Sequence, residues 1–195
     1  MYDNNTQTLS YNQDEARRIL QEGGWEYKYN RWQKTENYRT TRINLSLTVN
    51  SEDANRVAVA ETIKNQLEQI GIKITIRKVS ASQYNTILQN KNYEMLLTGV
   101  YNSYSPNLET FFGSDNLENY GNGEINSILN DVKNITDENL LKEKYNKIVE
   151  IYNNELPFVS LYRNKETVVK GQGLAGEITP NNYFSYYNIN TWSRM

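Results

Sequence analysis

The side chains able to do chemistry in this 195-residue chain are carboxylates, amines, guanidinium groups and hydroxyls, because the sequence has no cysteine and no histidine. A cysteine nucleophile, a Cys/His zinc site, a disulfide and a Ser-His-Asp triad are therefore excluded. Acid–base catalysis would have to use carboxylates, Lys or Tyr. With 23 acidic residues, many carboxylate pairs arise for structural reasons alone, so each pair has to be judged by its position.

The most prominent carboxylate groups have structural explanations. The acidic pairs at 52–53 and 137–138 stand at expected helix starts, where the helix dipole favours negative charge. Asp115, Glu118 and Glu124 lack the alternating Asp/Asn-Gly spacing of a calcium loop. We therefore expect no enzymatic activity, no metal site and no cofactor. A carboxylate-based glycosidase is the alternative enzyme, and it would need two acids facing each other across a cleft.

Charge and hydropathy exclude two further classes of protein. Lys plus Arg is 21 against 23 Asp plus Glu, and this near-balance argues against a nucleic-acid partner. The longest apolar runs are only a few residues, such as 95–97, so no transmembrane helix is expected. The first ten residues lack the hydrophobic core of a signal peptide.

A strand–helix–strand unit is the clearest pattern in the chain. Residues 43–49 alternate between apolar and polar side chains, and 72–76 do so again, as half-buried strands do. Between them, apolar residues recur at helical spacing over 53–70, and Gly71 ends that helix. Such a βαβ unit is almost always parallel and right-handed. We therefore predict parallel strands at 43–49 and 72–78, joined by the helix.

The other elements surround this unit in one α/β domain with an irregular C-terminal extension. Residues 93–101 predict a third strand, apolar on both faces, as in the middle of a covered sheet. Residues 25–41 are expected to form a loop or an irregular hairpin. Further helices are predicted at 12–24, 82–90, 108–112, 124–134 and 137–155, and further strands at 158–163 and 166–169.

Five segments in the same order resemble the C-terminal part of the extracellular solute-binding proteins of family 5, the peptide- and nickel-type receptors of ATP-binding-cassette (ABC) importers. The segment similar to the family's helix ending in Gly-Trp is YNQDEARRILQEGGW (11–25), and the one similar to its helix followed by an Ile-Gly-Ile strand is VAVAETIKNQLEQIGIKITIR (57–77). The segment similar to its strand with a ligand-facing turn is YEMLLTGVYNSYSPN (93–107), and the one similar to its Tyr-x-Asn-x-Glu helix is NYGNGEINSILNDV (119–132). The segment similar to its long helix ending at a Glu-x-Pro turn is LLKEKYNKIVEIYNNELPFVSLYRN (140–164).

The resemblance implies a fold and a domain organisation. The fold is the C-terminal lobe of a type II periplasmic-binding-protein (Venus-flytrap) fold, an α/β structure with a mixed sheet flanked by helices. Residues 1–164 would form the ligand-binding lobe, incomplete at its N-terminal side. Residues 165–195 would form a hinge-crossing strand and an irregular tail that packs on the missing N-terminal lobe. Family members are more than twice this length, so the chain is expected to be a fragment.

The resemblance also implies a function, an extracytoplasmic solute-binding component of an ABC importer, with peptide uptake as the expected role. The alternatives are a non-peptide solute, such as an oligosaccharide or a metal complex, and a peptide-sensing receptor without import. The expected partners are the small solute and the ABC permease subunits. The expected location is the outer face of the cell membrane, as a lipoprotein of a Gram-positive cell, or the periplasm. Membrane attachment would be only through a lipid anchor absent from this fragment.

The expected ligand site is the end of the third strand, because ligands of open α/β sheets favour the carboxyl ends of the strands. Gly99 would let the ligand backbone approach closely, and Tyr101 and Tyr104 could offer stacking faces and hydroxyls. Ordinary packing is an equally good explanation for these tyrosines. The predicted site residues are Thr98, Gly99, Val100, Tyr101, Asn102, Ser103 and Tyr104.

One departure from the family pattern leads to a prediction about ligand chemistry. Many peptide-binding members have an Asp a few residues after the strand's glycine, and it pairs with the peptide's free amino group. Here that position falls on Ser103, and no acidic residue lies between Glu94 and Glu109. A buried ammonium without a carboxylate partner is unfavourable. We therefore expect the ligand to present to this strand end a blocked N-terminus, a neutral polar group or a peptide backbone in another register.

Overall fold

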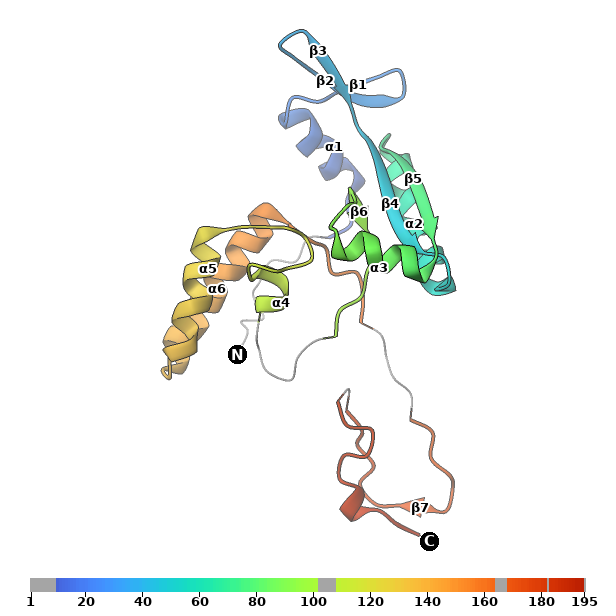
Figure 1. Ribbon diagram of the computed structural model, residues 1–195, viewed down its shortest axis with the longest axis vertical. Helices are drawn as coiled ribbons and strands as arrows, with labels where there is room; N and C mark the ends of the chain where they lie inside the picture. The colour runs from blue at the N-terminus through green and yellow to red at the C-terminus, as the bar shows by residue number, and fades with distance from the viewer. Residues whose placement is uncertain (1–9, 102–107, 164–167, 182, 195) are drawn as a thin grey trace. The chain divides into compact units, whose positions relative to one another are not determined.

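The computed structural model describes residues 10–101, 108–163, 168–181 and 183–194, which divide into two compact units. The first comprises the described residues up to Tyr101 together with 108–155, and the second comprises those after Glu155. Figure 1 shows the course of the chain within each unit. Among the described residues, none of the helices is both long enough and apolar enough to cross a lipid bilayer.

The centre of the first unit is a three-stranded parallel sheet with the order β5-β4-β6. Strand β4 (Asn44–Asn50) pairs along its whole length with β5 (Lys73–Val79), and helix α2 (Ala54–Gln69) makes the crossover between them. Strand β6 (Met95–Leu96) pairs with the other side of β4. The predicted βαβ unit, with its parallel strands and connecting helix, is therefore confirmed.

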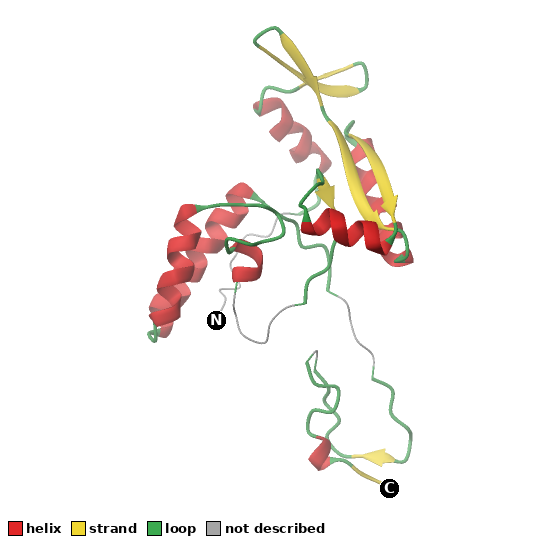
Figure 2. Ribbon diagram, in the orientation of Figure 1, coloured by secondary structure: helices red, strands yellow, loops and turns green. Residues whose placement is uncertain are grey.

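Both faces of this sheet are covered. Leu47, Val49 and Ile74 form a buried core with Ala60 of α2. Thr48, which points to the opposite face of β4, is also only 1% exposed. Helix α3 (Ala81–Gln89) packs against β4, so that the two helices lie behind and in front of the strands in Figure 2.

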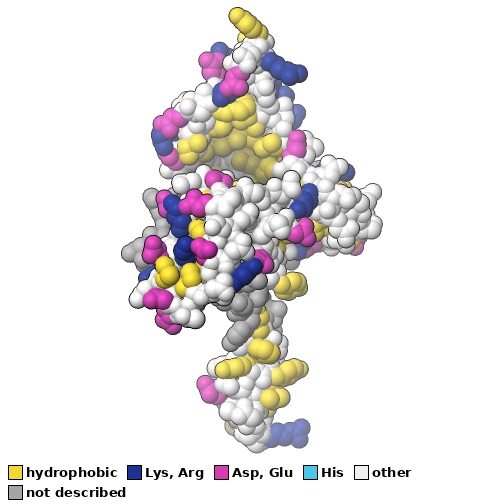
Figure 3. Space-filling model, turned by 60° about the vertical axis from the view of Figure 1, so that its left-hand side comes forward, with side chains coloured by type: hydrophobic (Ala, Val, Ile, Leu, Met, Phe, Trp, Pro, Cys, Tyr) yellow, Lys and Arg dark blue, Asp and Glu magenta, His cyan; other side chains and the backbone are white. Residues whose placement is uncertain are grey.

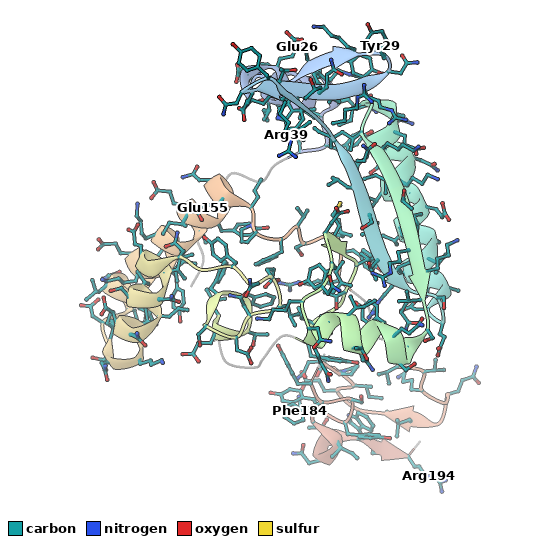
Figure 4. The ribbon with its side chains drawn as sticks, turned by 45° about the horizontal axis from the view of Figure 1, so that its top comes forward. Glu26, Tyr29, Arg39, Glu155, Phe184 and Arg194 are labelled. Atoms are coloured by element: carbon teal, nitrogen blue, oxygen red, sulfur yellow. The ribbon has the colours of Figure 1, made fainter. Side chains whose placement is uncertain are left out.

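The segment before this unit folds into helix α1 (Gln13–Glu22) and an antiparallel sheet of three short strands. These are β1 (Glu26–Lys28), β2 (Arg31–Glu36) and β3 (Arg39–Arg42), so the irregular hairpin predicted for 25–41 has three strands. Two-residue turns with positive φ join them, and exposed Tyr29 is labelled at the first turn in Figure 4. Trp32 is 2% exposed, and its indole N–H donates to the carbonyl of Ile70 over 2.6 Å, which anchors the sheet at the end of α2.

The rest of the first unit is helical. It contains α4 (Glu109–Phe112), α5 (Gly123–Asp131), a 3₁₀ turn (Val132–Asn134) and α6 (Glu138–Glu155). The buried side of α5 packs on that of α6, and both carry apolar residues at helical spacing. Helix starts are capped as expected, and the side chain of Asp137 accepts from the backbone N–H groups of Asn139 and Leu140. The helices predicted for 108–112, 124–134 and 137–155 are confirmed.

The second unit has little regular structure in its described part. Strand β7 (Leu174–Ala175) pairs with β8 (Ser193–Arg194), and a 3₁₀ turn (Ile189–Thr191) precedes the latter. The indole N–H of Trp192 donates to the carbonyl of Glu177 over 3.1 Å. No described residue of this unit is buried. Apolar side chains accordingly stand at its surface, seen as the yellow atoms at the lower end of Figure 3.

Two of the sequence predictions about strands need correction. Residues 158–163 form no strand, and neither do 168–169, while 166–167 lie outside the described residues. A strand needs a hydrogen-bonded neighbour and a face to bury, but Val159 is 67% exposed and Leu161 48%. The third strand is shorter than the predicted 93–101, since only 95–96 pair with β4, and it lies at the edge of the described sheet, whose middle strand is β4. After β4 the next backbone hydrogen bond is again with β5, since Ser51 N–H donates to the carbonyl of Val79.

Candidate functional site

The candidate site lies where the chain leaves β6 at the carboxyl edge of the parallel sheet. Leu97 comes directly after this strand and is followed by Thr98, Gly99, Val100 and Tyr101, which the sequence predicted for this place. Gly99 is exposed, Val100 is 39% exposed and Tyr101 completely so. Asn102, Ser103 and Tyr104, the other predicted site residues, lie outside the described residues. Four of the seven predicted site residues are thus described, and three of these four, Gly99, Val100 and Tyr101, are exposed.

The base of this segment is held firmly by Leu97. Its N–H donates to the carbonyl of Thr48 over 3.0 Å, which extends the ladder by one bond past β6. Its carbonyl accepts from the hydroxyl of Tyr84 on α3 over 2.9 Å. Leu97 and Tyr84 are 8% and 5% exposed, so both bonds are sheltered from water. Because both polar groups of Leu97 are fixed, the direction in which Thr98 leaves the sheet is fixed as well.

The other end of β6 is fixed by Glu94. Its carboxylate oxygen Oε2 accepts from the backbone N–H of Ser46 over 2.6 Å and from the Ser46 hydroxyl over 2.8 Å. These two hydrogen bonds stabilise the ionised form and lower the pKa of Glu94 below its usual value. Glu94 therefore connects the start of β6 to the start of β4 through these two hydrogen bonds.

A guanidinium group lies beside the candidate segment. Asp53 caps α2 by accepting from the N–H of Arg56 over 3.0 Å, and its other oxygen pairs with Nε of Arg56 at 3.1 Å. This pairing turns the end of the Arg56 side chain toward Gly99, where a methyl group would stand 3.1 Å from Nη2 and 3.8 Å from Cζ. Sequence reasoning did not single out Arg56. The available signal was its place in the first turn of a crossover helix, which starts at the carboxyl edge of the sheet.

The loop between α4 and α5 is built around Asn116, which is 1% exposed. Its side-chain amide donates to the carbonyls of Gly113 and Tyr120, and its oxygen accepts from the N–H of Tyr120. The hydroxyl of Tyr93, just before β6, donates to the carbonyl of Leu117 in the same loop. The loop is therefore fastened both to itself and to the strand that leads to the candidate site.

Glu118 in this loop is in the opposite situation to Glu94. Its Oε2 atom is buried and has no hydrogen-bond partner among the described residues. Burial raises the pKa of this carboxyl group, and backbone N–H groups and Lys91 offset only part of that effect. Asp115 and Glu124, the acids grouped with it by sequence, do not join it in a metal site: the described residues hold no cluster of three or more His, Cys, Asp or Glu side chains able to bind one.

The helical part of the unit carries a shallow groove between α5 and α6. It is lined by acidic and basic side chains that pair with each other, as Lys144 does with Asp131 at 2.9 Å and Lys147 with Glu150 at 3.0 Å. The interspersed dark blue and magenta side chains in Figure 3 show such mixed charge over the helices. This groove contains none of the predicted site residues, and its lining carries four acidic and two basic residues, of which two acid–base pairs are those just named.

Comparison with known proteins identifies relatives of this arrangement. The model of the family described as bacterial extracellular solute-binding proteins, family 5 middle, matches residues 1–122. Over 94% of this chain, 22% of residues are identical to those of the oligopeptide-binding protein AppA from Bacillus subtilis. The structure of AppA in complex with a nonapeptide matches 100% of this chain with a TM-score of 0.77 and 21% identity.

Two other solved structures have a similar fold. A mannohexaose-bound periplasmic oligopeptide-binding protein from Thermotoga maritima matches 80% of this chain, with a TM-score of 0.70 and 19% identity. NikZ from Campylobacter jejuni, in complex with Ni(L-His), matches 96% of it, with a TM-score of 0.68 and 17% identity. These structures share the fold of type II periplasmic binding proteins, so the predicted fold class is confirmed. The chain spans 35% of the length of AppA, and 31% and 40% of the other two chains.

Proposed function

Because the chain belongs to family 5 of the bacterial extracellular solute-binding proteins, we propose that it forms one wall of a peptide-binding cleft in a receptor that supplies an ABC importer. The match over residues 1–122 supports the family and the similarity to AppA favours a peptide ligand. The observation that carries the proposal is the segment Thr98–Tyr101, which leaves an anchored parallel sheet at its carboxyl edge and whose last three residues are exposed.

An exposed strand end suits a peptide because peptides are recognised through their backbones. A ligand lying alongside Thr98–Tyr101 would exchange backbone hydrogen bonds with it, whatever its side chains. Gly99 adds no side chain that would keep the ligand at a distance. The side chain of Tyr101, completely exposed, offers an aromatic face and a hydroxyl group to a bound molecule.

The proposed mechanism is binding without covalent change. In a two-lobe receptor the open and closed forms are in equilibrium, and a ligand that touches both lobes stabilises the closed form. In this proposal residues 1–164 belong to one lobe, and residues 165–195 cross to the other and pack on it. The closed receptor would then be recognised by the permease subunits outside the cytoplasm. A lipid anchor on the full-length receptor would keep it at the membrane surface.

The experiment is to identify the ligand that the full-length receptor carries. The receptor is purified without added solute and denatured, and the released small molecules are analysed by mass spectrometry. A mixture of short peptides is the expected result. Recovery of an oligosaccharide or of a metal complex, in molar amounts comparable to the receptor and without peptides, would overturn the peptide assignment but not the family.

A non-peptide solute is the second candidate, and two solved structures of similar fold favour it. One of them holds mannohexaose and the other Ni(L-His). An exposed aromatic ring such as that of Tyr101 is also a surface on which a sugar can stack. Titration of the ligand-free receptor with a nonapeptide pool and with mannohexaose in parallel separates the two candidates, since the proposed function requires the peptide to bind more tightly.

A further inference from the structure

Arg56 offers hydrogen-bond donors that the described part of the protein leaves unused. A guanidinium group has five N–H donors, and here the Nε donor faces Asp53. The terminal nitrogens, with four donors, have no hydrogen-bond partner among the described residues, although the side chain is only 31% exposed. These donors remain within reach of solvent, because about a third of the side-chain surface is exposed. They are therefore suited to a partner that arrives from outside.

The absence of a side chain at position 99 makes space for the Arg56 side chain and is not required by the backbone conformation. Gly99 does not have a positive φ, so its conformation is open to any residue. What glycine provides here is space, since a β-carbon would lie 3.1 Å from Nη2, closer than side chains normally approach. Glycine thus lets the guanidinium group lie against the exposed strand end where a ligand is proposed to bind.

The charge around this point favours an acceptor and disfavours an amine. The chain has no acidic residue from 95 to 108, so no carboxylate on the strand or the following segment could hold a ligand's ammonium group. Asp53, the acid nearest to Arg56 in the sequence, is already engaged with it. An ammonium group at Gly99 would meet a like charge, whereas a carboxylate or carbonyl oxygen would meet donors.

We propose that Arg56 is a ligand-binding residue whose terminal nitrogens hold an acceptor oxygen of the ligand at the Thr98–Gly99 strand end. The oxygen belongs either to the C-terminal carboxylate of a peptide or to a main-chain carbonyl. This assignment rests on the proposed function. It makes Arg56 a determinant of how the ligand is oriented, because the amino end of the peptide is directed away from this strand.

The test uses the full-length receptor and a random nonapeptide pool made in three forms: free at both ends, acetylated at the N-terminus, or amidated at the C-terminus. The half-saturating pool concentration is measured by equilibrium dialysis for wild type and three variants at the site. R56Q removes the charge, R56K keeps the charge but loses the planar fork, and G99A displaces the guanidinium group. R18Q is the matched control, because Arg18 is an exposed arginine paired with Glu15 and Glu22 on α1.

R56Q is expected to raise the half-saturating concentration tenfold or more, and R56K and G99A at least threefold, while R18Q stays within twofold of wild type. Acetylation is expected to change wild-type binding less than twofold. If the oxygen is the terminal carboxylate, amidation weakens wild type tenfold and leaves R56Q unchanged. If it is a main-chain carbonyl, amidation has no effect on either, and R56Q still loses tenfold.

Two results would overturn the inference in distinguishable ways. If wild type binds the pool and R56Q, R56K and G99A all remain within twofold of it, Arg56 has no role in binding. If wild type binds none of the three forms, the proposed peptide function fails, and the assignment of Arg56 falls with it. Thermal unfolding followed by circular dichroism identifies a variant that does not fold, and the other two then carry the test.

Discussion

Two glutamates near Tyr93 have environments with opposite effects on their ionisation. Glu94 is the next residue after Tyr93, and Glu118 is the next residue after Leu117, the hydrogen-bond partner of Tyr93. Ser46 gives the carboxylate of Glu94 two hydrogen bonds. One oxygen of Glu118 is buried without a partner among the described residues. Ionisation is therefore favoured at the first and disfavoured at the second, which gives the two residues opposite effects on stability as the pH changes.

Replacement of Glu118 by Gln should stabilise the protein at neutral pH. Burial raises the folded-state pKa of Glu118, so the cost of ionising it is absent below its unfolded pKa of about 4.3 and grows as the pH rises. Glutamine removes that cost, and the gain should not exceed about 1 kcal/mol because part of the side chain is solvated. Urea unfolding at pH 7 and pH 4 should show a gain only at pH 7. E143Q, on an exposed position of α6, should show no such gain.

Replacement of Glu94 by Gln should have the opposite sign. The pKa of Glu94 is lowered by the Ser46 hydroxyl and N–H, so its contribution is complete above the unfolded pKa of about 4.3 and is lost as the pH falls through the folded pKa. E94Q should therefore unfold at a lower urea concentration than wild type at pH 7, and at nearly the same concentration at pH 3. An equal loss at both values would show that packing, and not the charge, is what the substitution removes.

At the scale of elements, the end of α2 is where the antiparallel sheet joins the parallel one. The indole of Trp32 from β2 donates to Ile70, and the ring of Tyr27 from β1 lies against Gly71. Gly71 has φ +85°, a left-handed conformation that ends the helix, and a β-carbon there would overlap the Tyr27 ring. The glycine is thus needed twice, once for the backbone and once for the space.

Gly71→Ala should therefore be clearly destabilising, by about 2–4 kcal/mol, because strain at positive φ and the clash add. Gly123→Ala is the matched control: it lies in the first turn of α5 with no atom near its added β-carbon, and it should be neutral or slightly stabilising. In the Y27A background the clash is absent, so G71A should lower the free energy of unfolding by less there than it does in the wild type. The difference between these two losses is the part due to the clash.

The elements that sequence reasoning predicted well are those whose pattern is set by local burial. Ile43 to Val49 alternates strictly, and α2 repeats its apolar residues at helical spacing, so both patterns mark the sides that form the shared core, although Thr48 on the other face of β4 is buried as well. The three-stranded sheet over 26–42 was only partly predictable, because most of its side chains are exposed and its turns depend on Tyr and Asn residues at positive φ. The segment 158–163 looks like a strand from composition, but pairing is a property of the neighbours, which no local pattern contains.

The candidate site was likewise predictable only where a local sequence pattern marks it. That Thr98–Tyr101 come just after a strand of the parallel sheet could be predicted from the sequence, and the rule that ligands bind at the carboxyl ends of such strands makes them candidates. Arg56 could not be found in this way, because it lies more than 40 positions before Gly99 in the sequence. Only the cap at Asp53 and the course of α2 bring its guanidinium group to the strand end.

At the scale of the whole molecule, the two units differ in what holds them together. The first has buried cores around the parallel sheet, α3 and the α5–α6 pair. The described part of the second has no buried residue, and eleven of its large apolar residues are 39% to 88% exposed, from Leu156 to Ile189. Burial of apolar surface is the main source of stability, so nearly all of it should reside in the first unit.

A chain ending at Glu155 should accordingly keep the stability of the first unit. Its thermal midpoint is expected to lie within about 3 °C of that of the 195-residue chain, because no described residue of the removed part is buried. Differential scanning calorimetry on both proteins makes the comparison. Loss of the cooperative transition on truncation would show that residues after Glu155 stabilise the first unit.

The positions of the tryptophans give the two units separate optical reporters. The protein has three tryptophans, of which Trp32 is buried in the first unit and Trp192 lies in the second, partly exposed beside Tyr186. A shielded indole emits at shorter wavelength than one in contact with water. Once Trp25 is replaced by Phe, a red shift on denaturation tracks the first unit through Trp32. A change in the longer-wavelength emission on adding a ligand or a second lobe tracks the second unit through Trp192. The chain can thus be followed at two places in one spectrum, without an attached dye.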